Sequence, residues 1–211
     1  MAEPSYLTTA RVSYDVVARD YAELAPARFA GDPVGRAIVA AFAEQVRAVG
    51  GPVADLGCGP GHVTAHLASL GVSAFGVDLS PRMVDIARRK YPDLRFDIGS
   101  FTNLHIGDGR LGGVLAWWSI CHTPPEVLPS VFDQFHRTLA TGGHMLVGFY
   151  VGDAHLRPER GYGHPVCYST YLLRPEHVCD LLSRAGFAVT ARLLTNGRKW
   201  PQACLLAHKA R

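Results

Sequence analysis

The stretch that decides the fold of this chain is Val53-Ala54-Asp55-Leu56-Gly57-Cys58-Gly59-Pro60-Gly61-His62-Val63-Thr64. It begins as a short apolar strand, passes through an acid and three alternating glycines, and then opens a helix. Glycine lacks Cβ, so it adopts positive φ at little cost and lets a ligand approach the backbone closely. Three glycines so close together therefore indicate a binding turn, and nucleotide-like ligands are the obvious candidates.

The glycine spacing separates the possible kinds of nucleotide-binding turn. A dinucleotide fingerprint requires a glycine at the sixth position of the turn, where this chain has His62. A P-loop requires Gly-Lys-Ser/Thr, and no lysine lies near this turn in the sequence. The remaining pattern, Asp-x-Gly-x-Gly-x-Gly from Asp55 to Gly61, therefore matches neither of these two phosphate-binding turns.

A second apolar stretch supports a ligand that contains a nucleoside. The residues from Val72 to Val77 predict a buried strand, and Ser80-Pro81 predicts a helix with a serine N-cap. Between them, Asp78 lies 23 residues after Asp55 (78 minus 55), where a doubly wound fold brings an acid beside a ribose. A carboxylate in that place can accept hydrogen bonds from both ribose hydroxyls.

Length and composition favour one soluble domain. The chain has 211 residues, of which 48% are hydrophobic and 18% are charged, so residues 1–211 can bury a full core as a single domain. The sequence contains no apolar run long enough to span a bilayer, and its N-terminus lacks the pattern of an export signal. We therefore expect a cytoplasmic protein that does not contact membranes.

Charge, cysteines and histidines give little support to nucleic acids, disulfides or metals. The formal net charge is +3, and the one basic cluster, residues 88–90, falls in the last turn of a predicted helix, where positive charge is favourable. The five cysteines are odd in number and irregularly spaced, which predicts reduced thiols. His62 and His66 share a helix face without a third ligand at a recognisable spacing. We expect no metal and no nucleic-acid partner.

Predicted helices and strands alternate from about residue 33, which is typical of an α/β sheet with helices on both faces. Asp32-Pro33 predicts the start of one helix, and Thr123 and Glu126 predict a capping box at the start of another. Two segments lie outside the alternation, a helical N-terminal cap over residues 1–32 and a polar loop over residues 152–167. Because ligands bind outside the carboxyl ends of the strands, we expect both segments to cover the site, although each could serve packing alone.

These motifs resemble the class I methyltransferases that use S-adenosylmethionine (SAM) to modify small molecules. The segment from Tyr14 to Tyr21 is similar to their Tyr-Asp-x-x-Ala-x-x-Tyr entry helix, and Asp55 to Gly61 is similar to their first motif. The resemblance implies a three-layer, doubly wound, mostly parallel seven-stranded sheet with an N-terminal helical cover. It also implies SAM as the cofactor, S-adenosylhomocysteine as the product and no metal.

The resemblance also assigns residues to the cofactor. They are Tyr14, Asp55, Gly57, Cys58, Gly59, Gly61, Asp78, Leu79, Met83, Ser100, Phe101 and Trp117. Asp55 is expected to bind the amine of SAM and Asp78 its ribose. Ser100 stands where the family usually has an aspartate that contacts the adenine amine, and the backbone could serve there instead.

The acceptor is expected beside the segment from Trp117 to His122. His122 is the first candidate for a general base, because an imidazole accepts a proton at neutral pH, and the alternative is a structural histidine that caps the next helix. Tyr14 and Tyr21 are further catalytic candidates. The residues expected to line the acceptor pocket are Trp118, His122, His164 and Tyr168. Side chains alternate along a strand, so one of Trp117 and Trp118 is expected to meet the ligand and the other the core.

The likeness extends to actinobacterial natural-product methyltransferases, some of which methylate indole C3. We therefore expect a small aromatic acceptor, with indole-type C- or N-methylation, and a monomer or homodimer. An O-methyltransferase acting on a hydroxylated or acidic metabolite and a non-catalytic SAM-binding regulatory protein remain alternatives. A nicotinamide-dependent dehydrogenase would require the glycine that His62 replaces.

Overall fold

A seven-stranded sheet forms the centre of the molecule. The computed structural model describes residues 4–197 and 199–210. In spatial order the strands are β10 (Phe187–Thr195), β11 (Gln202–Lys209), β5 (Leu139–Tyr150), β4 (Leu111–Trp117), β1 (Val53–Leu56), β2 (Ala74–Asp78) and β3 (Phe96–Ile98). From β5 to β3 all neighbours are parallel, whereas β11 is antiparallel to both β5 and β10. The mostly parallel sheet expected from the sequence is confirmed.

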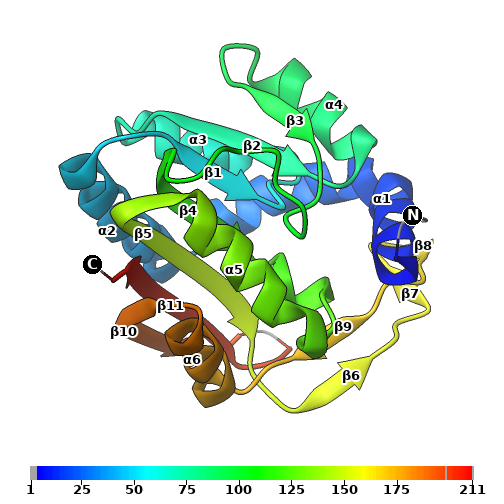
Figure 1. Cartoon of the computed structure of the whole chain (residues 1–211). Coiled ribbons are helices and arrows are strands. Elements are labelled where there is room, and N and C mark those ends of the chain that lie inside the picture. The colour runs from blue at the N-terminus through cyan, green and yellow to red at the C-terminus, as the bar shows by residue number, and fades with distance from the viewer. Residues whose placement is uncertain (1–3, 198, 211) are drawn as a thin grey trace.

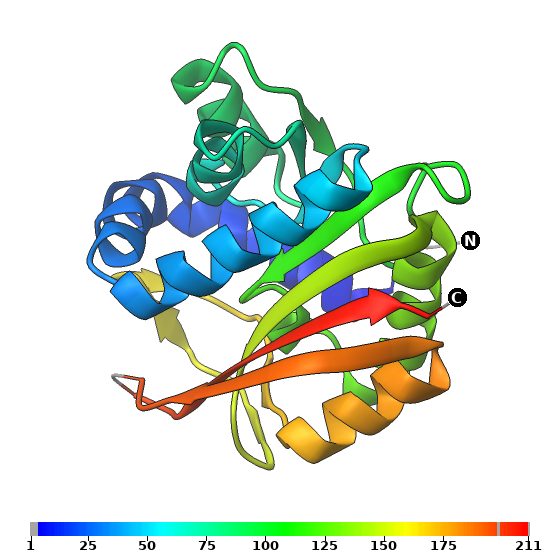
Figure 2. The same ribbon diagram turned by 90° about the vertical axis from the view of Figure 1, so that its left-hand side faces the viewer.

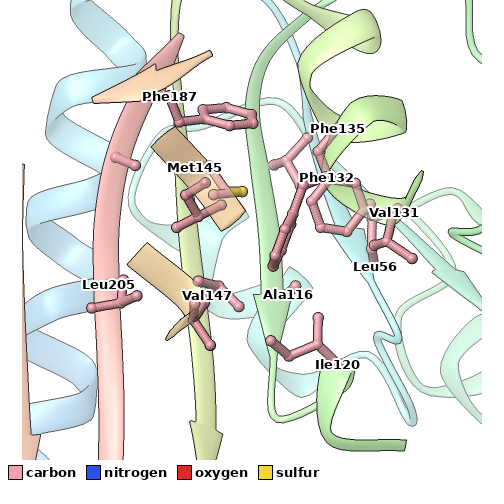
Figure 3. Close-up of a cluster of buried hydrophobic side chains, with 14 of the residues drawn as sticks. Leu56, Ala116, Ile120, Val131, Phe132, Phe135, Met145, Val147, Phe187 and Leu205 are labelled. Atoms are coloured by element: carbon pink, nitrogen blue, oxygen red, sulfur yellow. The ribbon is translucent and has the colours of Figure 1, made fainter. Parts of the chain in front are cut away.

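Helices cover both faces of this sheet (Figures 1 and 2). They are α2 (Pro33–Val49) and α3 (His62–Ser69) on one face, and α5 (Leu128–Thr138) and α6 (Pro175–Arg184) on the other. Alternation along β5 shows the division, because Met145 and Val147 pack with Phe132 of α5, whereas Leu146 packs with Phe42 of α2. Figure 3 shows the α5 side of this core. The doubly wound arrangement leaves the carboxyl ends of the central strands free for a site.

The N-terminal helix and one long connection complete the structure. Helix α1 (Ser5–Ala30) contacts α4 (Pro81–Lys90), which follows β2. The connection that we call the roof segment, residues 152–170, contains β6 (Ala154–Leu156), β7 (Arg160–Gly161) and β8 (His164–Pro165) and reaches β9 (Thr170–Leu172). The short β7–β8 hairpin lies beside α1 in Figure 1. Sequence analysis predicted a loop over residues 152–167, and the segment instead contains these short strands.

Two of the three helix starts argued from the sequence are capped as predicted. The Asp32 carboxylate accepts from the Gly35 backbone N–H at 2.9 Å, and the Ser80 hydroxyl accepts from the Met83 N–H at 3.1 Å. The capping box at Thr123 is wrong. The chain passes through two 3₁₀ turns, η1 (Ile120–His122) and η2 (Pro125–Val127), before α5 begins, and no side-chain cap bond forms at η2 or α5. Consecutive prolines at 124 and 125 explain the delay, because a residue before proline is disfavoured in helical geometry.

Membrane-spanning helices were sought across residues 4–197 and 199–210. None of the helices there combines the length and the apolar composition that a bilayer crossing requires.

Candidate functional site

A cavity of about 740 Å³, partly open to solvent, lies at the carboxyl ends of β1, β2 and β4. The predicted site residues that line it are Tyr14, Tyr21, Gly57, Gly59, Asp78, Leu79, Met83, Ser100, Phe101, Trp117, Trp118 and His122. The fold thus brings together residues from α1, from the glycine turn and from the end of β4.

Further lining residues were not predicted. They are Leu7, Ala10, Arg11, Ser80, Ser119 and Thr123, while Gly99 lines the cavity in the turn that was expected to border adenine. Three of them come from the first two turns of α1, where the sequence offered only a general expectation of a cover. Ser119 could have been found from its position directly after the two tryptophans. Its hydroxyl donates to the Leu56 carbonyl at 2.7 Å, which links the end of β4 to the glycine turn.

The three glycines of the turn all have positive φ, and packing requires two of them. The φ values are 78° at Gly57, 54° at Gly59 and 80° at Gly61. A Cβ at Gly57 would overlap Ser119, and one at Gly61 would lie 2.7 Å from the Phe96 ring. A Cβ at Gly59 would meet only Tyr21, at 3.5 Å. Gly57 and Gly59 line the cavity, whereas Gly61 lies outside its lining and is needed for packing.

Asp78 reaches the cavity at the end of β2 with both carboxylate oxygens anchored. Oδ2 accepts from the Gly59 N–H at 2.7 Å, and Oδ1 accepts from the Ser80 N–H at 2.8 Å. Burial raises the pKa of Asp78 to about 6, although these backbone N–H groups lower it. A carboxylate has about four acceptor positions, so Asp78 retains the capacity to bind the two hydroxyls of a ribose.

Asp55 lies behind the glycine turn, outside the cavity lining. It is 1% exposed, and its Oδ2 accepts from the Thr64 hydroxyl at 2.6 Å. Its Oδ1 is buried and has no hydrogen-bond partner among the described residues. Burial, helped by the nearby charge of Asp78, raises the pKa of Asp55 to about 7, although the hydrogen bond from Thr64 lowers it. Its predicted contact with the amine of SAM stays a prediction.

These residues fit a cofactor such as SAM. The cavity presents backbone at Gly57 and Gly59, where side chains would intrude, next to a carboxylate with free acceptor positions. The unpartnered Asp55 Oδ1 lies behind the same turn and provides an acceptor for a donor that reaches the turn. The cradle, Asp78 and the unpartnered oxygen are what a nucleoside joined to an amino acid requires.

His122 and Tyr14 form a hydrogen-bonded pair at the other side of the cavity. The Tyr14 hydroxyl lies 2.7 Å from His122 Nε2, and His122 Nδ1 lies 2.7 Å from the Ser169 carbonyl oxygen of the roof segment. A carbonyl only accepts, so Nδ1 carries the proton and Nε2 accepts from Tyr14. Burial lowers the pKa of His122 and raises the pKa of Tyr14. Both groups are therefore neutral at pH 7.

Aromatic rings pack around this pair. The Tyr14 ring stacks on Tyr168 with centroids 5.5 Å apart and meets Tyr21 edge to face at 6.0 Å. Tyr168 also lies 4.9 Å from the His122 ring. Tyr168 is 9% exposed and lies outside the cavity lining. It therefore supports Tyr14 and His122 from behind.

Both tryptophans line the cavity, so the expected alternation at Trp117 and Trp118 is wrong. The reason is that β4 ends at Trp117 and Trp118 has φ 58°, a left-handed conformation that costs a non-glycine residue roughly 1 to 3 kcal/mol. Trp118 is held by its N–H, which donates to the Gly148 carbonyl at 3.1 Å, and by stacking on Tyr150 at 5.3 Å. With this backbone conformation a second tryptophan lines the cavity.

Three further predicted residues lie elsewhere. His164 Nε2 is 2.6 Å from a carboxylate oxygen of Asp20, so it links the β7–β8 hairpin to α1 outside the cavity lining. Cys58 is buried against Phe96, and Gly61 contacts the same ring. His62 and His66 both pack their rings on Phe29. Within residues 4–197 and 199–210, no group of three or more metal-ligating side chains is found.

Comparisons with known proteins find methyltransferases that are similar to this chain. A family described as a methyltransferase domain matches residues 53–143. An uncharacterized methyltransferase of Synechocystis is 28% identical over 156 residues, which cover 70% of this chain and 72% of that protein. The N-demethylindolmycin N-methyltransferase of Streptomyces griseus is 30% identical over 108 residues. That match covers 46% of this chain and 43% of the relative, so the chain spans less than half of the relative's length.

Solved structures with the same fold include the 1,6-didemethyltoxoflavin N1-methyltransferase of Burkholderia thailandensis, bound to 1,6-didemethyltoxoflavin and S-adenosylhomocysteine. Its TM-score is 0.74 at 19% identity, covering 100% of this chain and 92% of that chain. This likeness confirms the fold that the sequence predicted.

Proposed function

We propose that this chain, which belongs to the class I SAM-dependent methyltransferases, methylates a small, flat aromatic acceptor. The observation that carries the proposal is the aromatic wall of Tyr14, Tyr21, Trp118 and His122, which lines the same cavity as the glycine turn. Aromatic rings bind other flat rings by stacking and by edge-to-face contact. The acceptor would lie against this wall with its nucleophilic atom directed at the cofactor.

The chain's residues would hold the cofactor through the glycine turn and Asp78. Asp78 would accept from the ribose hydroxyls, Gly57 and Gly59 would let the ligand approach the backbone, and Ser100 and Phe101 would border the adenine. When bound, SAM would supply an electrophilic methyl group on a sulfonium. The acceptor would attack the methyl carbon directly, and the sulfur would leave as a thioether.

Alignment and exclusion of water would contribute most of the catalysis. Holding two reactants in line lowers a barrier by roughly 7 to 11 kcal/mol, whereas positioned proton transfer contributes about 10²- to 10⁴-fold. Helix α1 and the roof segment would provide the cover, since Ser169 contacts His122 and the β7–β8 hairpin contacts α1. Aromatic faces near the sulfonium would also attract its positive charge. His122, Tyr14 and Tyr21 are the catalytic candidates.

The named activities of two similar proteins support a small-molecule acceptor. One is N-methylation of N-demethylindolmycin and the other is N1-methylation of 1,6-didemethyltoxoflavin. Both proteins place the methyl group on nitrogen. For this chain we propose methylation of a ring-borne heteroatom, and an indole-type acceptor is one member of that class.

The test is methyl transfer from labelled SAM to a panel of indoles, hydroxyquinolines, naphthols and aliphatic alcohols and amines of similar size. We expect labelled product from the aromatic members only. Trp118→Ala should raise the KM for an aromatic acceptor about tenfold while S-adenosylhomocysteine binding, measured by calorimetry, stays within twofold. Turnover confined to aliphatic members, or an acceptor KM that is indifferent to Trp118→Ala, would contradict the aromatic acceptor.

A further inference from the structure

The pair of Tyr14 and His122 has a fixed direction of hydrogen bonding. Ser169 offers a carbonyl oxygen to His122 Nδ1 at 2.7 Å, so this nitrogen must donate. Nε2 is then the free base, and the Tyr14 hydroxyl, 2.7 Å away, donates to it. Tyr14 Oη keeps its lone pairs, and Tyr14 and His122 both line the cavity.

This arrangement blocks the simplest role for His122. A general base must be within hydrogen-bond reach of the proton that it removes, but Nε2 is already occupied by Tyr14 and Nδ1 by Ser169. An acceptor in the cavity can reach the lone pairs of Tyr14 Oη without breaking either bond. Tyr14 is held in place by stacking on Tyr168 and by edge contact with Tyr21.

We infer that the acceptor gives its proton to Tyr14 Oη while Tyr14 passes its own proton to His122 Nε2, so that His122 acts through Tyr14. The inference rests on the proposed function and narrows it, because the acceptor must then carry an O–H or N–H at the atom that is methylated. Ser169 is the positioning residue that fixes the His122 tautomer.

The atoms and charges balance. A lone pair of the acceptor heteroatom forms the bond to the methyl carbon, the pair of the broken carbon–sulfur bond stays on sulfur, and the acceptor proton ends as one proton on His122. The total charge of the site is unchanged, because the positive charge that the transfer removes from the cofactor sulfur reappears on the His122 ring. No phenolate accumulates on Tyr14, which is consistent with burial raising the pKa of its hydroxyl. The Ser169 carbonyl then faces the imidazolium Nδ1–H and stabilises it.

The first test needs no acceptor. Nitrogen NMR of ¹⁵N-histidine-labelled full-length protein, saturated with S-adenosylhomocysteine, reports which ring nitrogen of His122 is protonated. We expect the Nδ1–H tautomer, and we expect Tyr14→Phe to shift the Nε2 resonance without changing the tautomer. An Nε2–H tautomer would overturn the inference, because Nε2 could not then receive a proton. An Nε2 resonance that ignores Tyr14→Phe would overturn it too.

The second test measures turnover of two probe acceptors, 4-hydroxyquinoline and 1-naphthol. His122→Gln keeps an acceptor near Tyr14 but is not basic, so Tyr14→Phe and His122→Gln should each lower kcat about 10²- to 10⁴-fold. The double variant should be no slower than the slower single variant, since both residues act in one path. Each variant should bind S-adenosylhomocysteine within about threefold of the unmodified protein. Tyr91→Phe, which removes a phenol outside the cavity beside Phe96, is the matched control.

The outcomes separate this inference from the proposed function. A Tyr14→Phe enzyme that keeps full kcat while His122→Gln loses it would show direct use of His122 and overturn the relay. Failure of the unmodified protein to bind S-adenosylhomocysteine would instead contradict the proposed function. If the protein binds S-adenosylhomocysteine but methylates neither probe, the NMR test applies: the Nδ1–H tautomer of His122 supports the inference and the Nε2–H tautomer overturns it.

Discussion

The two sides of the cavity are built in opposite ways. The proposed cofactor side, which is the glycine turn with Asp55 and Asp78, consists of backbone and carboxylates from two adjacent strands. The acceptor side, which is Tyr14, Tyr21, Trp118 and His122 with the roof segment, consists of aromatic side chains from distant parts of the chain. Its hydrogen bonds join residues 108 positions apart at Tyr14 and His122 and 144 positions apart at Asp20 and His164.

This difference teaches how the two sides respond to change. The proposed cofactor side depends on backbone geometry and on the hydrogen bonds of Asp78 to the turn, so small substitutions at the turn glycines or at Asp78 should be severe. The acceptor side depends on stacked rings and on a half-exposed pair between α1 and the roof segment, so single changes there should be milder and should act on the acceptor alone.

The largest effect is expected from Gly57→Ala. The new Cβ would overlap Ser119 at a residue with φ 78°, so strain and steric overlap together should cost roughly 2 to 4 kcal/mol of unfolding free energy. Affinity for S-adenosylhomocysteine should fall at least 100-fold by calorimetry. The matched control is Gly71→Ala, at φ 79° with open space around the Cβ in the described structure. It should lose only about 1 kcal/mol and no affinity, and equal losses in the two variants would remove the special status of the turn.

Asp78→Asn should have the next largest effect. The amide offers a single acceptor oxygen, so the Gly59 and Ser80 N–H groups and a ribose would compete for it. Hydrogen bonds to a charged group contribute about 1.5 to 3 kcal/mol, which corresponds to a 10- to 100-fold loss of cofactor affinity. Asp97→Asn, at the position of β3 that pairs with Val77, removes a carboxylate that is bound to Arg95 at the surface. That control should bind normally, and similar losses in both variants would indicate a general effect of charge.

The contrast between the two sides also explains which features of the structure could be predicted from the sequence. The caps at Asp32 and Ser80 and the glycine turn were predictable, because each depends on residues within a few positions of one another. The mostly parallel seven-stranded sheet was predicted from the alternation of elements and from the family resemblance. By contrast, the partner of His122 could not be predicted. Tyr14 and Ser169 reach it only through the packing of α1 and the roof segment.

Two local predictions from the sequence were wrong, each for its own physical reason. The capping box at Thr123 failed because two prolines hold the chain out of helical geometry before α5. The alternation of Trp117 and Trp118 failed because the strand ends between them and Trp118 adopts positive φ. In the first case adjacent prolines override the capping pattern, and in the second the end of the strand overrides the alternation of side chains. The position of Asp55 behind the turn likewise depends on its bond to Thr64 in α3.

A smaller effect, of opposite sign on stability, is expected from Asp55→Asn. Burial raises the folded-state pKa of Asp55 to about 7 from its ordinary value of 3.8. A raised pKa means that this group favours folding below pH 3.8 and that the benefit is lost as pH rises through about 7. The neutral amide avoids that loss, so the unliganded variant should be more stable than the unmodified protein by about 1 to 2 kcal/mol at pH 8 and by little near pH 4. Urea unfolding at both pH values measures this, with Asp93→Asn, an exposed carboxylate, as the control. A variant destabilised equally at both pH values would show that the ionised Asp55 carboxylate does not destabilise the folded protein.

The smallest effect is expected on the acceptor side, from Asp20→Asn. The pair of Asp20 and His164 is about half exposed, with side-chain exposures of 44% and 42%, and exposed pairs contribute roughly 0.2 to 1 kcal/mol. The substitution should leave S-adenosylhomocysteine affinity unchanged, because the pair lies outside the cavity lining. It should raise the acceptor KM by about two- to fivefold, because the β7–β8 hairpin is then held to α1 less firmly. Glu23→Gln breaks the neighbouring pair with Arg19 on the same helix, at 68% and 89% exposure, and should change neither constant. If Asp20→Asn weakened cofactor binding instead, the two sides of the cavity would be coupled through α1, and the separation between them would not hold.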